Sequence, residues 1–218
     1  MSRPLKIDVW SDLACPWCFL GKRRLEEGVK QYRAEGGDRE VTLEFHSYEL
    51  SPDTPVDFAG STVDFLVQHK GMGEAQVRQM VGRITDLGTQ EGLAYDFDAI
   101  QQTRTLKPHQ VLHLAKAEDL QMALVERLFT AYFEEGAHLG HDDVLADLAA
   151  EVGLDRDGVL RALDEGTYAA AVDADLAQAR AYGISSVPFF VIEGRYGVSG
   201  AQEPATFAQV LAKVSAEV

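Results

Sequence analysis

The hydrophobic pattern at the start of the chain has a period of two residues. Leu5, Ile7 and Val9 alternate with residues of the opposite face, which predicts a strand with one buried face over residues 5–10. Pro16 is well placed to begin a helix, because the N–H group that proline lacks has no helical acceptor in the first turn. Residues 41–47 alternate again. A strand, a helix and a second strand are therefore predicted by about residue 50.

Helical periodicity continues through the middle of the chain, and glycines mark the expected helix ends. The predicted helices cover residues 63–70, 74–92, 108–118, 120–135, 142–152, 155–165 and 168–182. A buried strand, a tight turn at residues 193–195, a second arm at residues 196–199 and a helix from Pro204 complete the pattern. This order predicts an α/β protein. Residues 1–60 and 166–218 would form one domain, and residues 61–165 an all-helical insertion between the second and third strands.

The composition narrows the class of partner. The chain has 218 residues, of which 46% are hydrophobic, enough for the full core of one large domain or of a domain with an insertion. Its 35 acidic and 20 basic residues give a formal net charge of -15, which argues against nucleic acid or an anionic membrane as a partner. No apolar run approaches the length that spans a bilayer, and no leader pattern precedes the first strand. We therefore expect a cytoplasmic protein.

Both cysteines of the chain lie between the first strand and the first helix, in the motif Cys15-Pro16-Trp17-Cys18. Unpaired backbone N–H groups and the positive end of the helix dipole favour an anion there, which predicts Cys15 as the nucleophile. Cys18, one helical turn further on, faces the same side and is placed to attack a mixed disulfide formed on Cys15. Pro16 and Trp17 are expected to bias the redox potential of the pair.

Metal-binding and structural explanations of the motif are weaker. A closed zinc site takes four ligands, and the sequence has no second cysteine pair. A structural disulfide would close a very short loop and constrain the unfolded chain little. His109 and His113 have the spacing of metal ligands on one helix face, but no third ligand is evident. One of them is expected to line a cleft and the other to be solvated, and no metal site is predicted.

The motifs resemble those of the DsbA-like family, in its cytosolic FrnE-like branch. This resemblance covers essentially the whole chain and implies a thioredoxin fold with a helical insertion. The residues that carry it are Ser11-Asp12, Cys15-Pro16-Trp17-Cys18, Gly21-Lys22, Gly183-Ile184-Ser185-Ser186-Val187-Pro188-Phe189-Phe190 and Ser199-Gly200-Ala201-Gln202.

A functional role for Pro188 is implied by the resemblance and not by the residues alone. The residues alone favour an ordinary trans proline that opens a strand. In the family's fold the matching proline is cis and faces the cysteine pair, which implies that the backbone of Val187 pairs with an extended substrate segment next to Cys15. Pro16 and Trp17 would line the same apolar substrate groove.

Two carboxylates near the motif are candidates for a proton acceptor. Asp8 and Asp12 are close to the cysteines in sequence, and a carboxylate beside the dithiol would accept the proton of Cys18 during exchange. Asp12 has the alternative role of satisfying backbone N–H groups in its loop.

The sequence therefore predicts a thiol-disulfide oxidoreductase or disulfide isomerase with no bound cofactor. Its partners would be a thiol or disulfide of a protein, a peptide or glutathione, with electrons exchanged with glutathione or a thioredoxin system. The direction stays open, because proteins with this motif span about -270 to -120 mV. One alternative is a glutathione-dependent isomerase or transferase, of the 2-hydroxychromene-2-carboxylate isomerase or kappa class, which typically has serine where Cys15 stands. The other is a chaperone-like peptide-binding module in which the cysteines are incidental.

Overall fold

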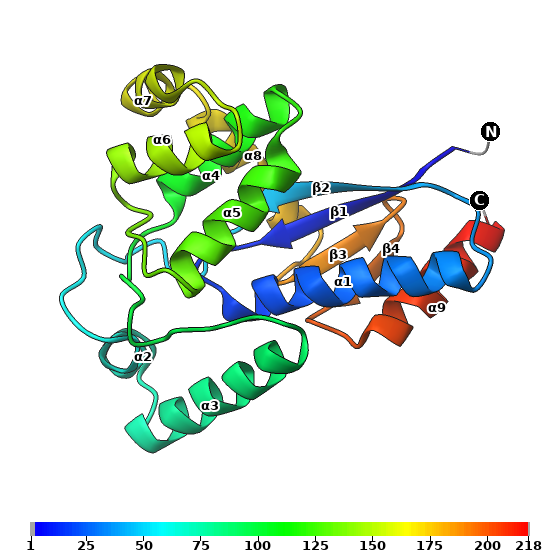
Figure 1. Ribbon diagram of the computed structural model, residues 1–218, viewed down its shortest axis with the longest axis horizontal. Coiled ribbons are helices and arrows are strands. Elements are labelled where there is room, and N and C mark those ends of the chain that lie inside the picture. The colour runs from blue at the N-terminus through cyan, green and yellow to red at the C-terminus, as the bar shows by residue number, and fades with distance from the viewer. Residues whose placement is uncertain (1–2, 218) are drawn as a thin grey trace.

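A single mixed sheet organises the protein, whose computed structural model describes residues 3–217 (Figure 1). Its strands have the spatial order β2-β1-β3-β4. Strand β1 is parallel to β2 and antiparallel to β3, so that Val9 lies opposite Phe45 on one side and Phe190 on the other. The strands are β1 (Leu5–Ser11), β2 (Val41–Ser47), β3 (Phe189–Ile192) and β4 (Tyr196–Ser199). The chain leaves β1 from the interior of the sheet and enters helix α1 (Pro16–Ala34) directly.

Helices cover both faces of the sheet. Leu5, Ile7 and Val9 belong to the same core as residues of α1 and α9 (Pro204–Glu217), two helices that lie side by side (Figure 1). Trp10 packs in a separate cluster with Ala179 of α8 (Ala169–Ala181), and its indole N–H donates to the Asp175 carbonyl at 3.1 Å. The prediction of one buried face for β1 is therefore confirmed at Leu5, Ile7 and Val9 but wrong at Trp10, which is only 2% exposed because α8 covers it.

Helices α1 and α9 are in close contact at Gly28. A Cβ added there would lie 2.5 Å from the Cβ of Phe207 and 2.7 Å from the carbonyl oxygen of Pro204. We expect Gly28→Ala to lower the free energy of unfolding by about 1–3 kcal/mol, because the backbone and the buried Phe207 have no room to yield.

Gly82, on the exposed side of α3 (Glu74–Gln90), provides the matched control. A Cβ added there meets no described atom of a neighbouring element within 4 Å. Gly82→Ala should therefore raise the free energy of unfolding by about 0.5–1 kcal/mol through helix propensity alone. Urea unfolding measures both variants, and equal effects would contradict close packing of α1 on α9.

The helices between β2 and α8 form two groups. Helix α2 (Thr62–Lys70) packs on α3, which also contacts α1. The second group consists of α4 (Leu106–Ala117), α5 (Gln121–Phe133), α6 (Asp142–Glu151) and α7 (Arg156–Asp164). Helix α4 contacts the other three helices of this group and also α8. The group lies beyond one end of the sheet, apart from α2 and α3 (Figure 1).

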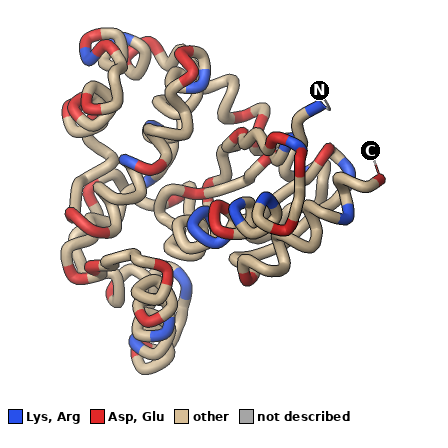
Figure 2. Tube along the Cα trace, turned by 45° about the vertical axis from the view of Figure 1, so that its right-hand side comes forward, with Lys and Arg blue, Asp and Glu red and all other residues tan. Residues whose placement is uncertain are grey.

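The predicted order of elements is confirmed, and so is the α/β class with helices between the second and third strands. Some element ends differ by a few residues, as α4 begins at Leu106 rather than Pro108, while β3 begins after Pro188 as predicted. The predicted domain limits stay a prediction. Figure 2 shows acidic and basic residues interspersed along the chain, both around the sheet and among the helices between β2 and β3. Between residues 3 and 217, no helix combines the length and the apolar character needed to cross a membrane.

Candidate active site

The two cysteines lie at the start of α1. Cys15 is the N-cap residue with an extended backbone (φ -98°, ψ 109°), and Pro16 opens the helix as predicted. The carbonyl oxygen of Cys15 accepts hydrogen bonds from the N–H groups of Cys18, at 2.9 Å, and Phe19, at 3.4 Å. Cys15 is 4% exposed and Cys18 1% exposed. The thiols are therefore one turn apart, with Cys18 the deeper of the two.

The surroundings of Cys18 keep its thiol protonated. Burial raises the pKa of Cys18 well above its usual range, and the adjacent Cys15 raises it further, while the backbone of Asp12 acts in the opposite direction. A thiol must lose its proton before it attacks a disulfide, so Cys18 needs a base at that moment. Cys15, unlike Cys18, lines a cavity. A substrate entering that cavity meets Cys15 first.

The segment before β3 reaches this site from the far end of the chain. The Val187–Pro188 peptide bond is cis. The carbonyl oxygen of Val187 lies 3.8 Å from the Sγ of Cys15, although the two residues are 172 positions apart. Pro188 is buried against α1, where a Cβ added to Gly21 would lie 2.7 Å from its Cγ. The two motifs of the sequence therefore meet at one place.

A largely apolar cavity of about 200 Å³ opens beside Cys15. Pro16 and Trp17 form the wall nearest the cysteine, as predicted for a groove. Other lining residues come from the segment between β2 and β3 and include Phe65, Leu66, Ile84, Phe97, Ile100 and Phe133. Apolar walls with few polar groups suit the apolar part of a small molecule or a peptide side chain.

Thr103 is a polar exception in the cavity wall. Its side chain is 3% exposed, and its Oγ1 has no hydrogen-bond partner in the described part of the chain. We expect Thr103→Val to raise the free energy of unfolding by about 1 kcal/mol, because valine keeps the shape and removes an unsatisfied buried hydroxyl.

Thr62, on the same cavity, is the control for Thr103. Its hydroxyl donates to the carbonyl of Phe97 at 3.0 Å and accepts from the side-chain amide of Gln102 at 3.1 Å. Thr62→Val should therefore lower the free energy of unfolding by about 1–3 kcal/mol. Thermal unfolding of both variants checks the contrast, and a loss of stability in Thr103→Val would show that its hydroxyl is satisfied.

Asp12 organises the turn that leads into the motif. Its carboxylate accepts hydrogen bonds from the N–H groups of Ala14, at 3.2 Å, and Leu50, at 2.7 Å. The side chain is 2% exposed and lies 3.7 Å from the Nε2 of His109. This is the loop role considered from the sequence. A proton-accepting role for Asp12 stays a prediction.

Asp8 belongs to a different group of charges. Its carboxylate lies 2.9 Å from both the Lys6 ammonium and the Nε2 of His46. These partners lower the pKa of Asp8 against the opposing effect of burial. Asp8 is therefore engaged on the opposite side of β1 from Val9, with α8 nearby through the bond between His46 and Asp175.

Neither His109 nor His113 is solvated, which corrects the expectation for one of them. His109 is 2% exposed, and its Nε2 donates to the Tyr48 carbonyl at 3.1 Å. His113 lies 3.0 Å from the Asp175 carboxylate. Both rings are held inside because α4 packs between α8 and the other helices of its group.

Tyr95 also belongs to the site, although the sequence pattern does not single it out. Its hydroxyl donates to the Pro16 carbonyl at 2.7 Å. Burial raises the pKa of Tyr95, and the nearby Cys15 and Cys18 raise it further. Tyr95 follows α3 in a segment without periodicity, so only the tertiary structure brings it to α1. It fixes the insertion to the first turn of the motif helix.

Comparison with known proteins yields one family and several similar structures. Residues 6–212 match the model of a family described as the DSBA-like thioredoxin domain. The crystal structure of a probable DsbA oxidoreductase from Streptomyces coelicolor is 33% identical and superposes with a TM-score of 0.89, over 98% of this chain and 91% of that chain.

Two further structures, at lower identity, share the fold. A 2-hydroxychromene-2-carboxylate isomerase is 15% identical with a TM-score of 0.75, over 97% of each chain. The cytosolic disulfide reductase DsbM from Pseudomonas aeruginosa, solved with GSH, is 18% identical with a TM-score of 0.64, over 96% of this chain and 98% of that chain.

Proposed function

Because the chain belongs to the family of DSBA-like thioredoxin domains, we propose that it is a thiol-disulfide oxidoreductase that works through Cys15 and Cys18. One observation carries the proposal. Cys15 lines the cavity, and its Sγ lies 3.8 Å from the carbonyl oxygen of Val187, while Cys18 lies one helical turn further into α1 and is more deeply buried. This is the arrangement that two-step disulfide exchange requires.

The reaction proceeds through two exchanges. The thiolate of Cys15 attacks one sulfur of a substrate disulfide, the substrate S–S bond breaks, and the other substrate sulfur leaves as a thiolate that takes up a proton. Cys18 then loses its proton and attacks the Sγ of Cys15. The mixed disulfide breaks, the Cys15–Cys18 disulfide forms, and the substrate leaves as a dithiol with two electrons gained. The same steps in reverse oxidise a dithiol substrate.

Val187 is proposed to position the substrate. The Cys15 thiol donates to the Val187 carbonyl. When Cys15 becomes a thiolate it has no proton to donate, so the backbone at Val187 is free to pair with an extended peptide or with the amide groups of glutathione. Pro16 and Trp17 would hold the apolar part of that substrate on the other side of Cys15.

The direction and the cellular location of the activity are a further part of this proposal. We place the protein in the cytoplasm and in the FrnE-like branch, with reduction or isomerisation as its direction and glutathione or a thioredoxin system as its electron partner. The similarity to a cytosolic disulfide reductase solved with GSH supports this proposal. No bound cofactor is needed, because the dithiol carries both electrons.

Catalysed exchange on a model substrate tests the proposal. The protein should accelerate reduction of insulin disulfides by glutathione, or oxidation of a reduced two-cysteine peptide by oxidised glutathione, at catalytic concentrations. Absence of turnover in both directions would overturn it.

The apolar cavity favours one second candidate, a glutathione-dependent isomerase or transferase acting on a small molecule. The isomerase that shares the fold points to the same class. Such an enzyme would turn over 2-hydroxychromene-2-carboxylate or a small electrophile with glutathione, and Cys18→Ser would leave that rate unchanged. A dithiol oxidoreductase would show no such turnover.

A further inference from the structure

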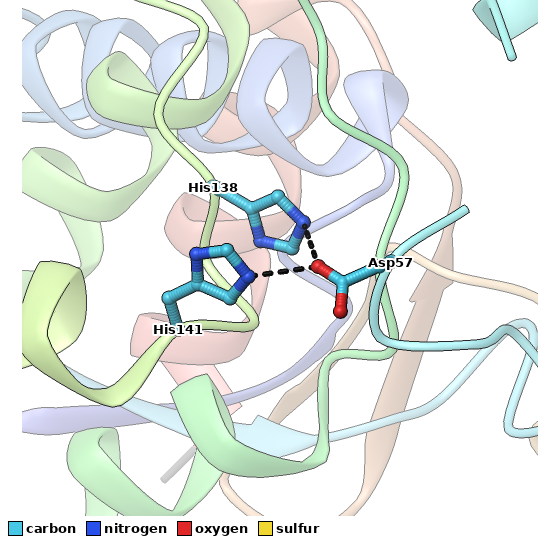
Figure 3. Close-up of side chains that lie close together, drawn as sticks. All are labelled: Asp57, His138 and His141. Carbon is cyan, nitrogen blue, oxygen red and sulfur yellow. Dashed lines mark hydrogen bonds and ion pairs between the residues drawn. The ribbon is translucent and has the colours of Figure 1, made fainter. Parts of the chain in front are cut away.

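Two groups of three side chains bring potential metal ligands together within residues 3–217. In each group the ligand atoms lie within 4.8 Å of one another. One group contains Asp8, Glu44 and His46, but the Lys6 and Lys116 ammonium groups already pair with its carboxylates. The other contains Asp57, His138 and His141, in which the carboxylate pairs with two imidazoles instead (Figure 3).

The geometry of the second group suits a transition-metal ion. The Oδ1 of Asp57 lies 3.3 Å from the Nε2 of His138 and 2.8 Å from the Nε2 of His141. Ligands about 2.0–2.1 Å from a tetrahedral zinc ion are separated from one another by about 3.3 Å, so the His138 distance matches an edge of that tetrahedron and the His141 distance must lengthen by about 0.5 Å. Two imidazoles and one carboxylate are also a donor set that Zn²⁺ accepts, with water as the fourth ligand.

Binding an ion requires a small rearrangement of the rings. The two imidazoles are stacked, with centroids 3.8 Å apart and planes 7° apart, so their Nε2 lone pairs lie in two nearly parallel planes. His141, whose side chain is 50% exposed, has room to tilt until both lone pairs converge. To bind the ion through Nε2, His138 must also carry its ring proton on Nδ1. That atom now accepts a hydrogen bond from the Gly140 N–H at 3.2 Å, and this bond would be lost.

The group joins two segments at the edge of the cavity. Asp57 lies between β2 and α2, in the same segment as Leu50, Ser51 and Thr54 of the cavity wall. The two histidines lie between α5 and α6. At Gly140, between them, an added Cβ would lie 2.2 Å from the Oγ1 of Thr103, another cavity residue, and 3.0 Å from Val56.

We propose that Asp57, His138 and His141 bind one Zn²⁺ ion, which fastens residues 48–61 to the connection between α5 and α6 beside the cavity. The carboxylate and the exposed imidazole face solvent, so the fourth position is open to water. The ion would take no part in disulfide exchange, since its ligands lie outside the group of residues that exchange disulfides. A test of Zn²⁺ binding is therefore independent of whether the protein exchanges disulfides.

Cobalt(II) provides the most direct test, because its visible spectrum reports the ligands. The protein, without an affinity tag, should carry Cys15→Ser and Cys18→Ser, since a dithiol binds the same ions. We expect one equivalent of Co²⁺ to bind and to be displaced by Zn²⁺. Loss of one ligand in His141→Ala should weaken Zn²⁺ binding by more than about tenfold. Asp8→Asn, in the competing group, is the matched control and should leave it unchanged.

Two readouts separate binding from a fold defect. Zn²⁺ should protect residues 48–61 from limited proteolysis, and this protection should disappear in His141→Ala while its circular dichroism stays that of the parent. In nuclear magnetic resonance spectra, Zn²⁺ should move the His138 ring proton to Nδ1 and shift the Gly140 amide. Zn²⁺ binding that survives both His138→Ala and His141→Ala, or no stoichiometric binding by the parent, would overturn the proposal.

Discussion

Cys18→Ser is expected to accumulate as a mixed disulfide through Cys15, whereas Cys15→Ser should lose disulfide exchange by a factor on the order of 10³ or more. The asymmetry follows from their positions. Cys15 faces the cavity and is proposed to attack the substrate, whereas Cys18 is buried with a raised pKa and is proposed to act only on the sulfur of Cys15. Without Cys18 the first exchange still occurs, but the internal step that releases the substrate cannot.

Mass spectrometry after incubation with oxidised glutathione and acid quenching measures this asymmetry. Cys18→Ser should carry one glutathione on Cys15, and Cys15→Ser should carry none. The double variant Cys15→Ser/Cys18→Ser controls for adducts elsewhere and should also carry none. An adduct on Cys18 in Cys15→Ser, formed as fast as the adduct on Cys15, would contradict the assignment of the nucleophile.

The second large effect concerns stability between neutral and alkaline pH. Burial alone would lower the pKa of His46, but the hydrogen-bonded carboxylates of Asp175 and Asp8 raise it from 6.5 to about 9. A pKa that is higher in the folded than in the unfolded chain stabilises the fold fully below the unfolded value, and this stabilisation is lost as the pH rises through the folded value. We therefore expect wild type to lose about 1–3 kcal/mol of unfolding free energy between about pH 6.5 and 9.5, discounted for the partial exposure of the ring.

His46→Gln should remove most of this slope, because glutamine carries no titrating proton. His69→Gln on the exposed side of α2 is the control and should keep the slope of wild type. Urea unfolding at a series of pH values gives both slopes. An equal pH slope in wild type and His46→Gln would contradict the role of the ion pairs.

The Asp175 carboxylate, which pairs with His46, affects stability in the acid range. Hydrogen bonds from His113 and His46 outweigh burial and lower the pKa of Asp175. The stabilisation that this carboxylate contributes is therefore lost as the pH falls through its folded pKa.

The core of the candidate site could be predicted from the sequence because its signals are local. The alternation before Cys15 and the proline after it fix a strand-to-helix turn, and the residues around Pro188 form a second recognisable motif. Their meeting at 3.8 Å followed from the family resemblance, since periodicity alone says nothing about which loops face each other.

Other features depend on tertiary packing that no local pattern encodes. Trp10 is buried because α8 crosses the second face of the sheet, and the chain segment that does so comes more than a hundred residues later. Tyr95 and Thr103 lie in irregular segments, and only the tertiary structure brings Tyr95 to the Pro16 carbonyl and Thr103 to the cavity. Asp8 and Asp12 both precede the motif closely in sequence, yet the structure gives them different partners.

The measurement that tests the central proposal most directly is equilibration of the pure protein in graded glutathione redox buffers, followed by alkylation and peptide mass analysis. A dithiol oxidoreductase predicts that Cys15 and Cys18 become protected from alkylation together, in one two-electron transition with a midpoint between about -270 and -120 mV. A Cys18 that stays open to alkylation across the whole range, with Cys15 either free or capped by glutathione, would contradict it.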